Sequence, residues 1–282
     1  MPAKILTGKE PADALLETLR APVQKLNPKL VIVQIGDDPG IDAYIRAKVK
    51  ACERIGLRAE HRHLSASVTK EEMLTLIGEI NGDADVTGLI VQTPLPSRLE
   101  KDAPVLFRAI DPKKDVDGFT AYNLGKLFLS QEFEHLPPAT PAGIISLLEF
   151  YKIPVAGKHV VIVGRSNIVG KPLAMMLLHR DATVTICHSK TKNLAAYTKE
   201  ADILIAATGK EKLMSADMIK KGVVVIDVGI TRTDAGLTGD VDFEHVKEVA
   251  SAITPVPGGV GPMTVASLLR NVVRAKERQI SA

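Results

Sequence analysis

Two side chains suited to proton transfer, Tyr44 and Lys48, lie four residues apart in the segment IDAYIRAKVKA. On a helix this spacing places both side chains on one face, where they would meet the same ligand. A lysine whose pKa is lowered by partial burial can accept a proton and return it near neutral pH. The pair could serve acid–base chemistry, but such pairs are common by chance, and Lys48 could instead be a solvated helix lysine like Lys50.

A second group of polar side chains comes from the predicted strand TGLIVQ, which ends at Gln92, and from the later loop DPKKDVDGF. The carboxyl ends of parallel strands form the binding sites of α/β sheets, so Gln92 is expected to face such a site. In the loop, Asp117 could accept paired hydrogen bonds from an amino-pyrimidinone edge, such as that of a pterin. Asp115 or Asp117 could equally close the loop, which is the commoner role of Asp before Gly.

The segment HVVIVGRSNIVGKPLAMMLL has the pattern of a buried strand, a glycine turn and a helix. Gly164 permits the tight turn, and the helix that follows offers free backbone N–H groups and a positive dipole end to a pyrophosphate. The spacing departs from the standard dinucleotide fingerprint, because Ser166 stands at the second glycine and Gly170 comes one residue late. A phosphate loop of the G-x-x-x-x-G-K-[ST] type does not fit, since Pro172 follows the lysine. The glycines could also serve only to pack the strand against the helix.

The choice between NAD and NADP depends on the residues that follow the next strand. NAD enzymes place an Asp or Glu there, about 20 residues after the glycines, to hold the ribose 2′-hydroxyl. This chain has ICHSK at 186–190, without a carboxylate. Arg165, Ser189 and Lys190 would supply hydrogen-bond donors and positive charge to a 2′-phosphate, which favours NADP. Arg165 could also be a solvated surface arginine.

A third glycine-rich segment, ITPVPGGVGPMTVASLL, lies between an extended run and the last predicted helix. Glycines without side chains would let the backbone approach a ligand closely. Its place in the chain favours the wall of a cleft between domains, although a tight linker is the simpler alternative.

Short β-branched runs alternate with amphipathic segments along the chain, a pattern typical of strand–helix–strand units with mostly parallel sheets. The sequence thus predicts an α/β protein. The expected strands are 29–35, 58–64, 86–92, 159–163, 182–187, 202–207, 223–228 and 251–254. The expected helices include 41–55, 69–81 and 264–278, the second of which opens with a Thr69–Glu72 capping box.

Two domains are expected because the stretch 111–141 is rich in Pro, Asp and Gly and separates two α/β units. The first is an N-terminal α/β domain at 1–140, joined by the C-terminal helix at 264–282. The second is a Rossmann-type domain at 141–263.

Composition narrows the classes of protein that remain. The chain has 282 residues, 45% of them hydrophobic and 24% charged, which is typical of a globular protein with a substantial core. A net charge of +3 is too small to indicate a nucleic-acid partner. The two cysteines, Cys52 and Cys187, form no zinc or disulfide motif, so no metal is expected. Without a secretory leader or a run of about 20 apolar residues, the protein is expected in the cytoplasm and away from membranes.

Taken in order, nine segments resemble the bifunctional methylenetetrahydrofolate dehydrogenase/cyclohydrolase family: YIRAKVKA, LIVQTPLP, KDVDGF, ATPAG, VGRSNIVGKP, TVTICHSKT, VVVIDVGI, GDV and PVPGGVGPMT. The resemblance covers about residues 30 to 275. It implies NADP-dependent oxidation of 5,10-methylenetetrahydrofolate and hydrolysis of the product to 10-formyltetrahydrofolate, in one-carbon metabolism and purine biosynthesis. It further implies a folate cleft between the two domains, a final helix that returns to the first domain, and a homodimer formed through the nucleotide domains.

The resemblance also assigns roles to individual residues. Tyr44 would line the folate pocket, Lys48 would be the catalytic base and acid, Gln92 would orient Lys48, and Asp117 would hold the pterin. Further substrate contacts are implied at Val91, Thr93, Pro257, Gly258 and Gly261. NADP contacts are implied at Gly164, Arg165, Ser166, Ser189 and Ile230.

Three positions depart from the family pattern. Ile41 stands where the family usually has Ser, so any hydrogen bond of that serine is absent. Thr93 replaces an expected Leu, and Ala139 replaces a common Cys.

Three rival hypotheses differ in how much of the chain they explain. Short-chain dehydrogenases also contain Y-x-x-x-K, but there the pair follows the nucleotide glycines, whereas here it precedes them. An NADP enzyme with a non-folate substrate would need the glycine loop but not Tyr44, Lys48, Gln92 and Asp117 together. A non-catalytic nucleotide sensor would need the glycine loop alone.

Overall fold

The structure is a computed structural model, and it describes residues 2–234 and 236–281. The chain divides into two compact units, named here by their sheets. The three-stranded domain comprises Ala14–Ala139 and Val265–Ala282, and the six-stranded domain comprises Met1–Asp13 and Thr140–Thr264.

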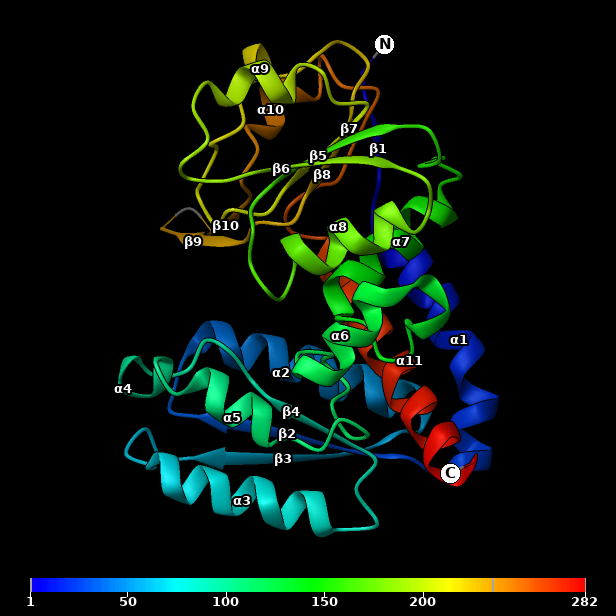
Figure 1. The fold of residues 1–282 in the computed structure, drawn as a ribbon, viewed down its shortest axis with the longest axis vertical. Helices are drawn as coiled ribbons and strands as arrows, with labels where there is room; N and C mark the ends of the chain where they lie inside the picture. The colour runs from blue at the N-terminus through cyan, green and yellow to red at the C-terminus, as the bar shows by residue number, and fades with distance from the viewer. Residues whose placement is uncertain (1, 235, 282) are drawn as a thin grey trace. The chain divides into compact units, whose positions relative to one another are not determined.

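Three helices contain the points where the chain passes from one domain to the other. These are α1 (Lys9–Leu26), α7 (Ala139–Phe150) and α11 (Val260–Ser281). Each domain otherwise has its own parallel sheet with flanking helices (Figure 1), and this confirms the predicted α/β class.

The sheet of the three-stranded domain has the order β3-β2-β4, with all neighbours parallel. Its strands are β2 (Lys29–Ile35), β3 (Arg58–Leu64) and β4 (Gly88–Val91). Helix α2 (Pro39–Ile55) connects β2 to β3, and α3 (Lys70–Gly82) connects β3 to β4. The remaining elements before α7 are α4 (Ser97–Glu100), α5 (Ala103–Ala109), α6 (Ala121–Leu129) and the 3₁₀ turn η1 (Gln131–Phe133).

The two faces of β2 carry different partners because side chains alternate along a strand. Val31, Val33 and Ile35 belong to a buried apolar cluster with residues of β4, α3 and α5. On the other face, Gln34 donates to Asp42 of α2 at 2.7 Å. The sheet therefore holds α2 and α3 on opposite sides.

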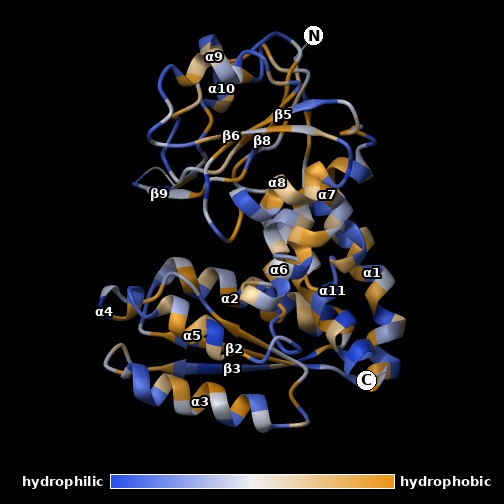
Figure 2. Ribbon diagram, viewed as in Figure 1, coloured by the Kyte–Doolittle hydropathy of each residue, from blue (hydrophilic) through white to orange (hydrophobic). Residues whose placement is uncertain are grey.

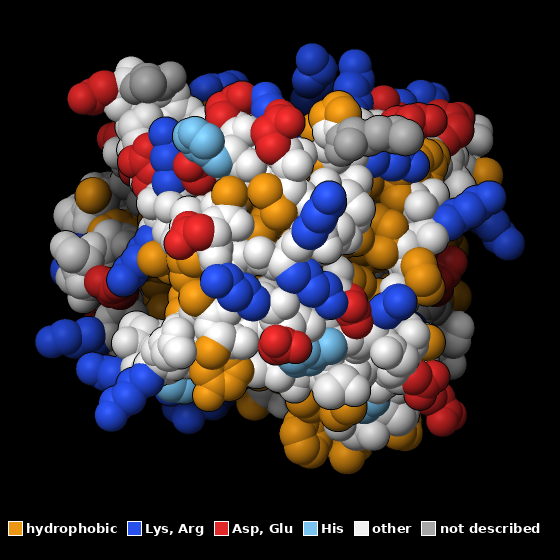
Figure 3. All heavy atoms as spheres, turned by 90° about the horizontal axis from the view of Figure 1, so that it is seen from above, with side chains coloured by type: hydrophobic (Ala, Val, Ile, Leu, Met, Phe, Trp, Pro, Cys, Tyr) orange, Lys and Arg blue, Asp and Glu red, His pale blue; other side chains and the backbone are white. Residues whose placement is uncertain are grey.

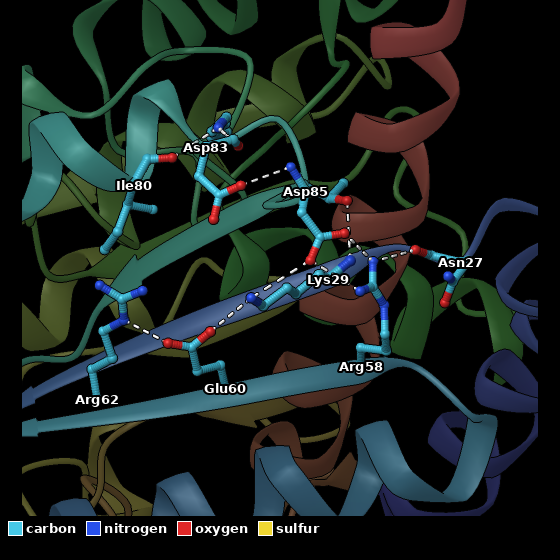
Figure 4. A network of polar contacts seen from close by, with 10 residues as sticks. Asn27, Lys29, Arg58, Glu60, Arg62, Ile80, Asp83 and Asp85 are labelled. Atoms are coloured by element: carbon cyan, nitrogen blue, oxygen red, sulfur yellow. Dashed lines mark hydrogen bonds and ion pairs between the residues drawn. The ribbon is translucent and has the colours of Figure 1, made fainter.

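The edge strand β3 is polar apart from Ala59 and Leu64, and none of its residues is buried. Figure 2 shows β3 as strongly hydrophilic beside the apolar β2 and β4. A network of charges ties it to its surroundings (Figure 4): Arg58 binds Asp85 through two nitrogens at 2.8 and 3.0 Å. Glu60 lies between Lys29, at 2.7 Å, and Arg62, at 2.6 Å.

The sheet of the six-stranded domain has the order β1-β11-β8-β7-β5-β6, and every pair is parallel. Buried residues of β5, β7 and β8 form its core, together with apolar side chains from the connecting segments. A separate antiparallel hairpin, β9–β10, follows β8. The strands are β1 (Lys4–Ile5), β5 (His159–Val163), β6 (Thr183–Cys187), β7 (Ile203–Ala206), β8 (Val224–Asp227), β9 (Thr231–Thr233), β10 (Gly236–Thr238) and β11 (Ala252–Ile253). The other helical elements are α8 (Gly170–Leu178), α9 (Leu194–Thr198), η2 (Ala216–Met218) and α10 (Phe243–Val246).

The structure differs from the sequence analysis at the N-terminus. The first thirteen residues were expected in the first domain, but they belong to the six-stranded domain. The cause is β1, which pairs with β11, and Gly8, whose N–H donates to the carbonyl of Gly258 at 2.8 Å. Sequence analysis also missed α1, α7 and the hairpin β9–β10.

Basic and acidic side chains are interspersed on the face of the molecule seen in Figure 3. Within residues 2–234 and 236–281, no helix is long and apolar enough to cross a membrane.

Candidate functional site

Lys48 lies on the buried side of α2, and the start of this helix is well defined. Asp38 caps the helix by accepting the N–H groups of Gly40 at 2.7 Å and Ile41 at 3.0 Å. The side chain of Lys48 is only 6% exposed, whereas Lys50 is exposed. The alternative of a solvated lysine therefore does not hold for Lys48.

The ammonium group of Lys48 is held by Gln92, the residue that the family resemblance implies would orient it. Lys48 Nζ donates to Gln92 Oε1 at 2.8 Å, and Gln92 Nε2 donates to the carbonyl of Thr93 at 2.8 Å. Gln92 directly follows β4, and its backbone N–H bonds to the carbonyl of Val33 at 2.8 Å. The amide of Gln92 thus accepts from Lys48 on one side and is anchored to the main chain on the other.

The two aspartates of the DVDGF loop have separate roles. Asp115 is buried and closes the loop: it accepts the N–H groups of Gly118 at 2.9 Å, Phe119 at 3.1 Å and Thr120 at 2.8 Å. It also accepts from Asn123 Nδ2 at 2.9 Å. The carboxyl group of Asp117 is partly buried and has no hydrogen-bond partner among the residues that the structure describes. Asp117 is therefore the aspartate available to a ligand.

Burial and charge set the protonation of this group of side chains. Burial lowers the pKa of Lys48, while the nearby Asp117 carboxylate acts in the opposite direction. Burial raises the pKa of Asp117 to about 6, with Lys48 opposing the shift and Asp115 adding to it. Burial also raises the pKa of Tyr44, so its phenol stays neutral. At neutral pH the site therefore combines an ionised Asp117 with a lysine whose proton is more easily removed than usual.

Two buried residues that sequence analysis missed hold the DVDGF loop in place. Lys114 Nζ donates to the carbonyls of Ile80 at 2.8 Å and Asp83 at 2.6 Å, at the C-terminal end of α3. Asn271 of α11 donates to the carbonyls of Val116 at 2.9 Å and Pro137 at 2.8 Å. Nothing in the sequence separates Lys114 from its exposed neighbour Lys113, so no signal could have found it.

Two of the three departures from the family pattern are apolar and buried. Ile41 is 7% exposed in the first turn of α2, and Ala139 is 4% exposed at the start of α7. Thr93 is partly exposed, and its carbonyl accepts from Gln92.

In the six-stranded domain, the glycine loop after β5 is tightly packed. Gly164 has φ +137°, and a Cβ atom there would lie 2.2 Å from the carbonyl oxygen of Ala207. A Cβ atom at Gly170 would lie 2.2 Å from the carbonyl oxygen of Gly164. Both glycines are thus required for packing, whatever else they contact.

The start of α8 differs from the expectation of free N–H groups. Ser166 Oγ accepts the N–H groups of Val169 at 3.1 Å and Gly170 at 3.3 Å, and its carbonyl accepts that of Lys171 at 3.1 Å. Because Pro172 has no N–H, the first turn of this helix is already largely satisfied by the loop.

The expected nucleotide contacts at the strand ends are exposed. Gly164 N–H donates to the carbonyl of Cys187 at 2.9 Å, which aligns the segments after β5 and β6. Arg165 and Ser189 each come two residues after the paired Val163 and Cys187. Ile230, after β8, is 39% exposed. Arg165 supplies a guanidinium donor and Ser189 a hydroxyl donor, and residues 186–190 contain no carboxylate. This combination suits the 2′-phosphate of NADP.

The PGGVG turn leads into α11. Pro257 and Gly258 are exposed, and Gly258 adopts φ +101°. A Cβ atom at Gly259 would lie 2.6 Å from the carbonyl oxygen of Pro255, whereas Gly261 has open space. Gly258 is therefore required by conformation and Gly259 by packing, while Gly261 leaves the backbone accessible. In the described part of the chain, no group of His, Cys, Asp or Glu side chains could hold a metal ion.

Comparison with known proteins gives one family for both domains. The catalytic-domain model of tetrahydrofolate dehydrogenase/cyclohydrolase matches residues 6–117, and the NAD(P)-binding-domain model of that family matches residues 138–280. The bifunctional protein FolD of Lactobacillus helveticus is 49% identical over 281 residues, with 98% of each chain covered. That of Methanosarcina mazei is 48% identical over 284 residues, covering 99% of this chain and 98% of the relative.

Solved structures of enzymes from the same family also match this chain over nearly its whole length. The bifunctional enzyme FolD of Campylobacter jejuni has a TM-score of 0.92 at 43% identity, with 98% of this chain and 99% of that chain covered. The Trypanosoma brucei methylenetetrahydrofolate dehydrogenase-cyclohydrolase, solved with NADP cofactor and inhibitor, has a TM-score of 0.94 at 33% identity, with both chains fully covered (100%). The chain belongs to the tetrahydrofolate dehydrogenase/cyclohydrolase family.

Proposed function

We propose that the chain catalyses two consecutive steps of one-carbon metabolism. The first is the NADP-dependent oxidation of 5,10-methylenetetrahydrofolate to 5,10-methenyltetrahydrofolate, and the second is its hydrolysis to 10-formyltetrahydrofolate. The observation that carries this proposal is the arrangement of Lys48, Gln92 and Asp117. A buried lysine, oriented by an amide, lies near a carboxylate that has no other partner in the described chain.

Asp117 binds the pterin in this proposal. Its carboxylate accepts two hydrogen bonds from the amino-pyrimidinone edge, which requires the ionised form. Because the pKa of Asp117 is about 6, the group is mostly ionised at neutral pH. Tyr44, neutral and on the same face of α2 as Lys48, lines the pocket, and further folate contacts are proposed at Val91, Thr93, Pro257, Gly258 and Gly261.

Lys48 carries the protons of the hydrolytic step. Neutral Lys48 removes a proton from the water that adds to the methenyl carbon, forming a carbon–oxygen bond. The resulting ammonium group then donates a proton to the ring nitrogen as the carbon–nitrogen bond breaks. The hydroxyl group of the adduct loses its proton to water in the same step, which opens the ring and leaves the formyl carbonyl. Burial lowers the pKa of Lys48 and so makes the neutral form accessible, while the hydrogen bond to Gln92 fixes the direction of Nζ.

NADP, when bound, would supply the hydride acceptor for the first step, for which no side chain needs to move a proton. The chain supplies binding and orientation: Arg165 and Ser189 hold the 2′-phosphate, and Gly164, Ser166 and Ile230 contact the cofactor. The exposed donors after β5 and β6 support this assignment.

An absorbance assay on the purified protein tests the function, since NADPH and methenyltetrahydrofolate can be followed together. Formation of NADPH with 5,10-methylenetetrahydrofolate, followed by loss of the methenyl absorbance, is the expected result. Turnover of neither folate would refute the proposal.

We also propose a homodimer and a cytoplasmic location. The dimer follows from the family pattern and from the general prevalence of two-fold assemblies. The location is consistent with two free, buried cysteines, Cys52 and Cys187, which suit a reducing compartment.

A further inference from the structure

Two buried carboxylates in the six-stranded domain have no part in the chemistry proposed above. Asp227 is the last residue of β8 and is 3% exposed. Asp240 follows the hairpin β9–β10 and is 0% exposed. Burying two carboxylates side by side opposes folding unless both are fully hydrogen-bonded, so their surroundings indicate what they do.

Asp227 fixes the chain that returns from the hairpin. Its side chain accepts the N–H groups of Asp240 at 2.9 Å, Val241 at 3.0 Å and Gly229 at 3.2 Å. Its own N–H donates to Thr254 Oγ1 at 2.7 Å. Burial, with the nearby Asp240 charge adding to it, raises the pKa of Asp227 to about 7 even though these N–H groups favour the ionised form. The backbone donors around Asp227 therefore offset part of the cost of burying its carboxylate.

Asp240 holds a different loop, the one that follows β7. It accepts three successive backbone N–H groups, those of Thr208, Gly209 at 3.2 Å and Lys210 at 2.9 Å. Three N–H groups on one carboxylate fix the course of a short loop much more firmly than side-chain packing alone.

That loop lies directly against the glycine turn. The N–H of Ala207 donates to the carbonyl of Val163 at 2.8 Å, and a Cβ atom at Gly164 would lie 2.2 Å from the carbonyl oxygen of Ala207. On the other side, a Cβ atom at Gly229 would lie 1.9 Å from Asp240 Oδ1. The carboxylate of Asp240 thus contacts both the loop beside Gly164 and the residue before Ile230.

We propose that Asp227 and Asp240 are positioning residues for the dinucleotide, which set the loops after β7 and β8 around the glycine turn before the cofactor arrives. The inference rests on the proposed function, because it takes Gly164 and Ile230 as cofactor contacts. The contacts form a chain. The side chain of Asp227 accepts the N–H of Asp240, the side chain of Asp240 accepts the N–H groups of residues 208–210, and this loop packs beside Gly164. A preformed surface binds with less loss of conformational entropy than one that must be ordered by its ligand.

The test is Asp240→Asn in the full-length chain, with both activities measured. Asn keeps the size but loses the negative charge and presents an NH₂ group to N–H donors. KM for NADP is expected to rise about ten- to a hundredfold, as for loss of charge-assisted hydrogen bonds. The rate of hydrolysis of added methenyltetrahydrofolate is expected to stay within about twofold of the parent, because this step needs water but no NADP. Asp242→Asn is the matched control, because the side chain of Asp242 contacts His245 at 2.7 Å and, in the described part of the chain, has no hydrogen bond to residues 208–210.

A second variant keeps the test decisive if Asp240→Asn does not fold. Lys210→Pro removes one of the three N–H donors from the loop and leaves both carboxylates intact. It should raise KM for NADP several-fold with hydrolysis unchanged. An unchanged KM in either folded variant would overturn the inference, and so would an equal loss of both activities together with a lower Tm. Titration with NADPH by fluorescence separates the two proposals, because it reads cofactor binding even if the parent turns over no folate.

Discussion

Replacement of Lys48 by Met should separate the two activities of the enzyme. Met has a similar length and is apolar, so it fits a position that is 6% exposed without leaving a charge to be buried. The change removes the only group proposed to move protons during hydrolysis. General acid–base groups contribute about 10²–10⁴-fold, so hydrolysis of methenyltetrahydrofolate should fall by that factor.

The oxidation should survive with a weaker substrate affinity. Lys48 holds down the pKa of Asp117, so its removal should raise that pKa above about 6, toward the pH of the assay. A smaller fraction of Asp117 would then be ionised at pH 7, and KM for methylenetetrahydrofolate should rise a few-fold. The loss should be smaller at pH 8, where Asp117 is ionised in both proteins. Methenyltetrahydrofolate should accumulate during turnover.

The assay follows NADPH and methenyl absorbance in the parent, in Lys48→Met and in the control Lys50→Met. Lys50 lies on the same helix but is exposed, so its replacement should change neither rate. Parental hydrolysis by Lys48→Met would refute the assignment and move the proton transfers to another group. Equal loss of both activities would mean that Lys48 acts in binding and not in proton transfer.

Four further outcomes are expected, the last of them from the family pattern. KM for the folate should rise as pH falls below about 6 in a pH series, because protonated Asp117 no longer accepts two hydrogen bonds; a flat profile would contradict its role. Arg165→Ala should lower the ratio of NADP to NAD affinity about ten- to a hundredfold, because a charge-assisted hydrogen bond contributes ~1.5–3 kcal/mol of binding free energy. An unchanged ratio in cofactor titrations would disprove the NADP preference. Lys114→Met should reduce the free energy of unfolding in urea by about 1–3 kcal/mol, because the carbonyls of Ile80 and Asp83 lose their donor, whereas the exposed Lys113→Met should not. Light scattering should give twice the single-chain mass of 30.3 kDa, and a monomer at micromolar concentration would rule out the homodimer.

Strands were predictable where β-branched residues form a continuous run between polar turns. β2, β3 and β5 have the bounds that the sequence indicated, and the capping box at Thr69 is present. β1 has two residues and gains its place only from β11, nearly the whole chain away. A segment this short carries no periodicity, so residues 1–13 could not be assigned to the correct domain.

The candidate site was predictable as a set of residue types but not as a set of contacts. The position of Gln92 after a strand predicted that it would face a binding site, and only the family resemblance implied its contact with Lys48. Lys48 Nζ and Gln92 Oε1 lie 2.8 Å apart. The residues alone could not decide between Asp115 and Asp117, because both lie in the same loop and only the folded chain shows which of them accepts the loop's N–H groups. The first turn of α8 also escaped prediction, since its N–H groups turn to Ser166 through loop geometry that the spacing of glycines does not encode.

The polarity of β3 has a consequence for how molecules of this enzyme behave at high concentration. An edge strand offers unpaired backbone groups with which a strand of another molecule could pair. Such pairing would bring a second copy against Arg58, Glu60 and Arg62, whose charges are already matched within the chain and would have to give up their water. Val or Thr in place of these side chains would remove that cost and make the strand a better template for pairing with another chain. The charges on β3 therefore oppose edge-to-edge pairing of this strand between molecules.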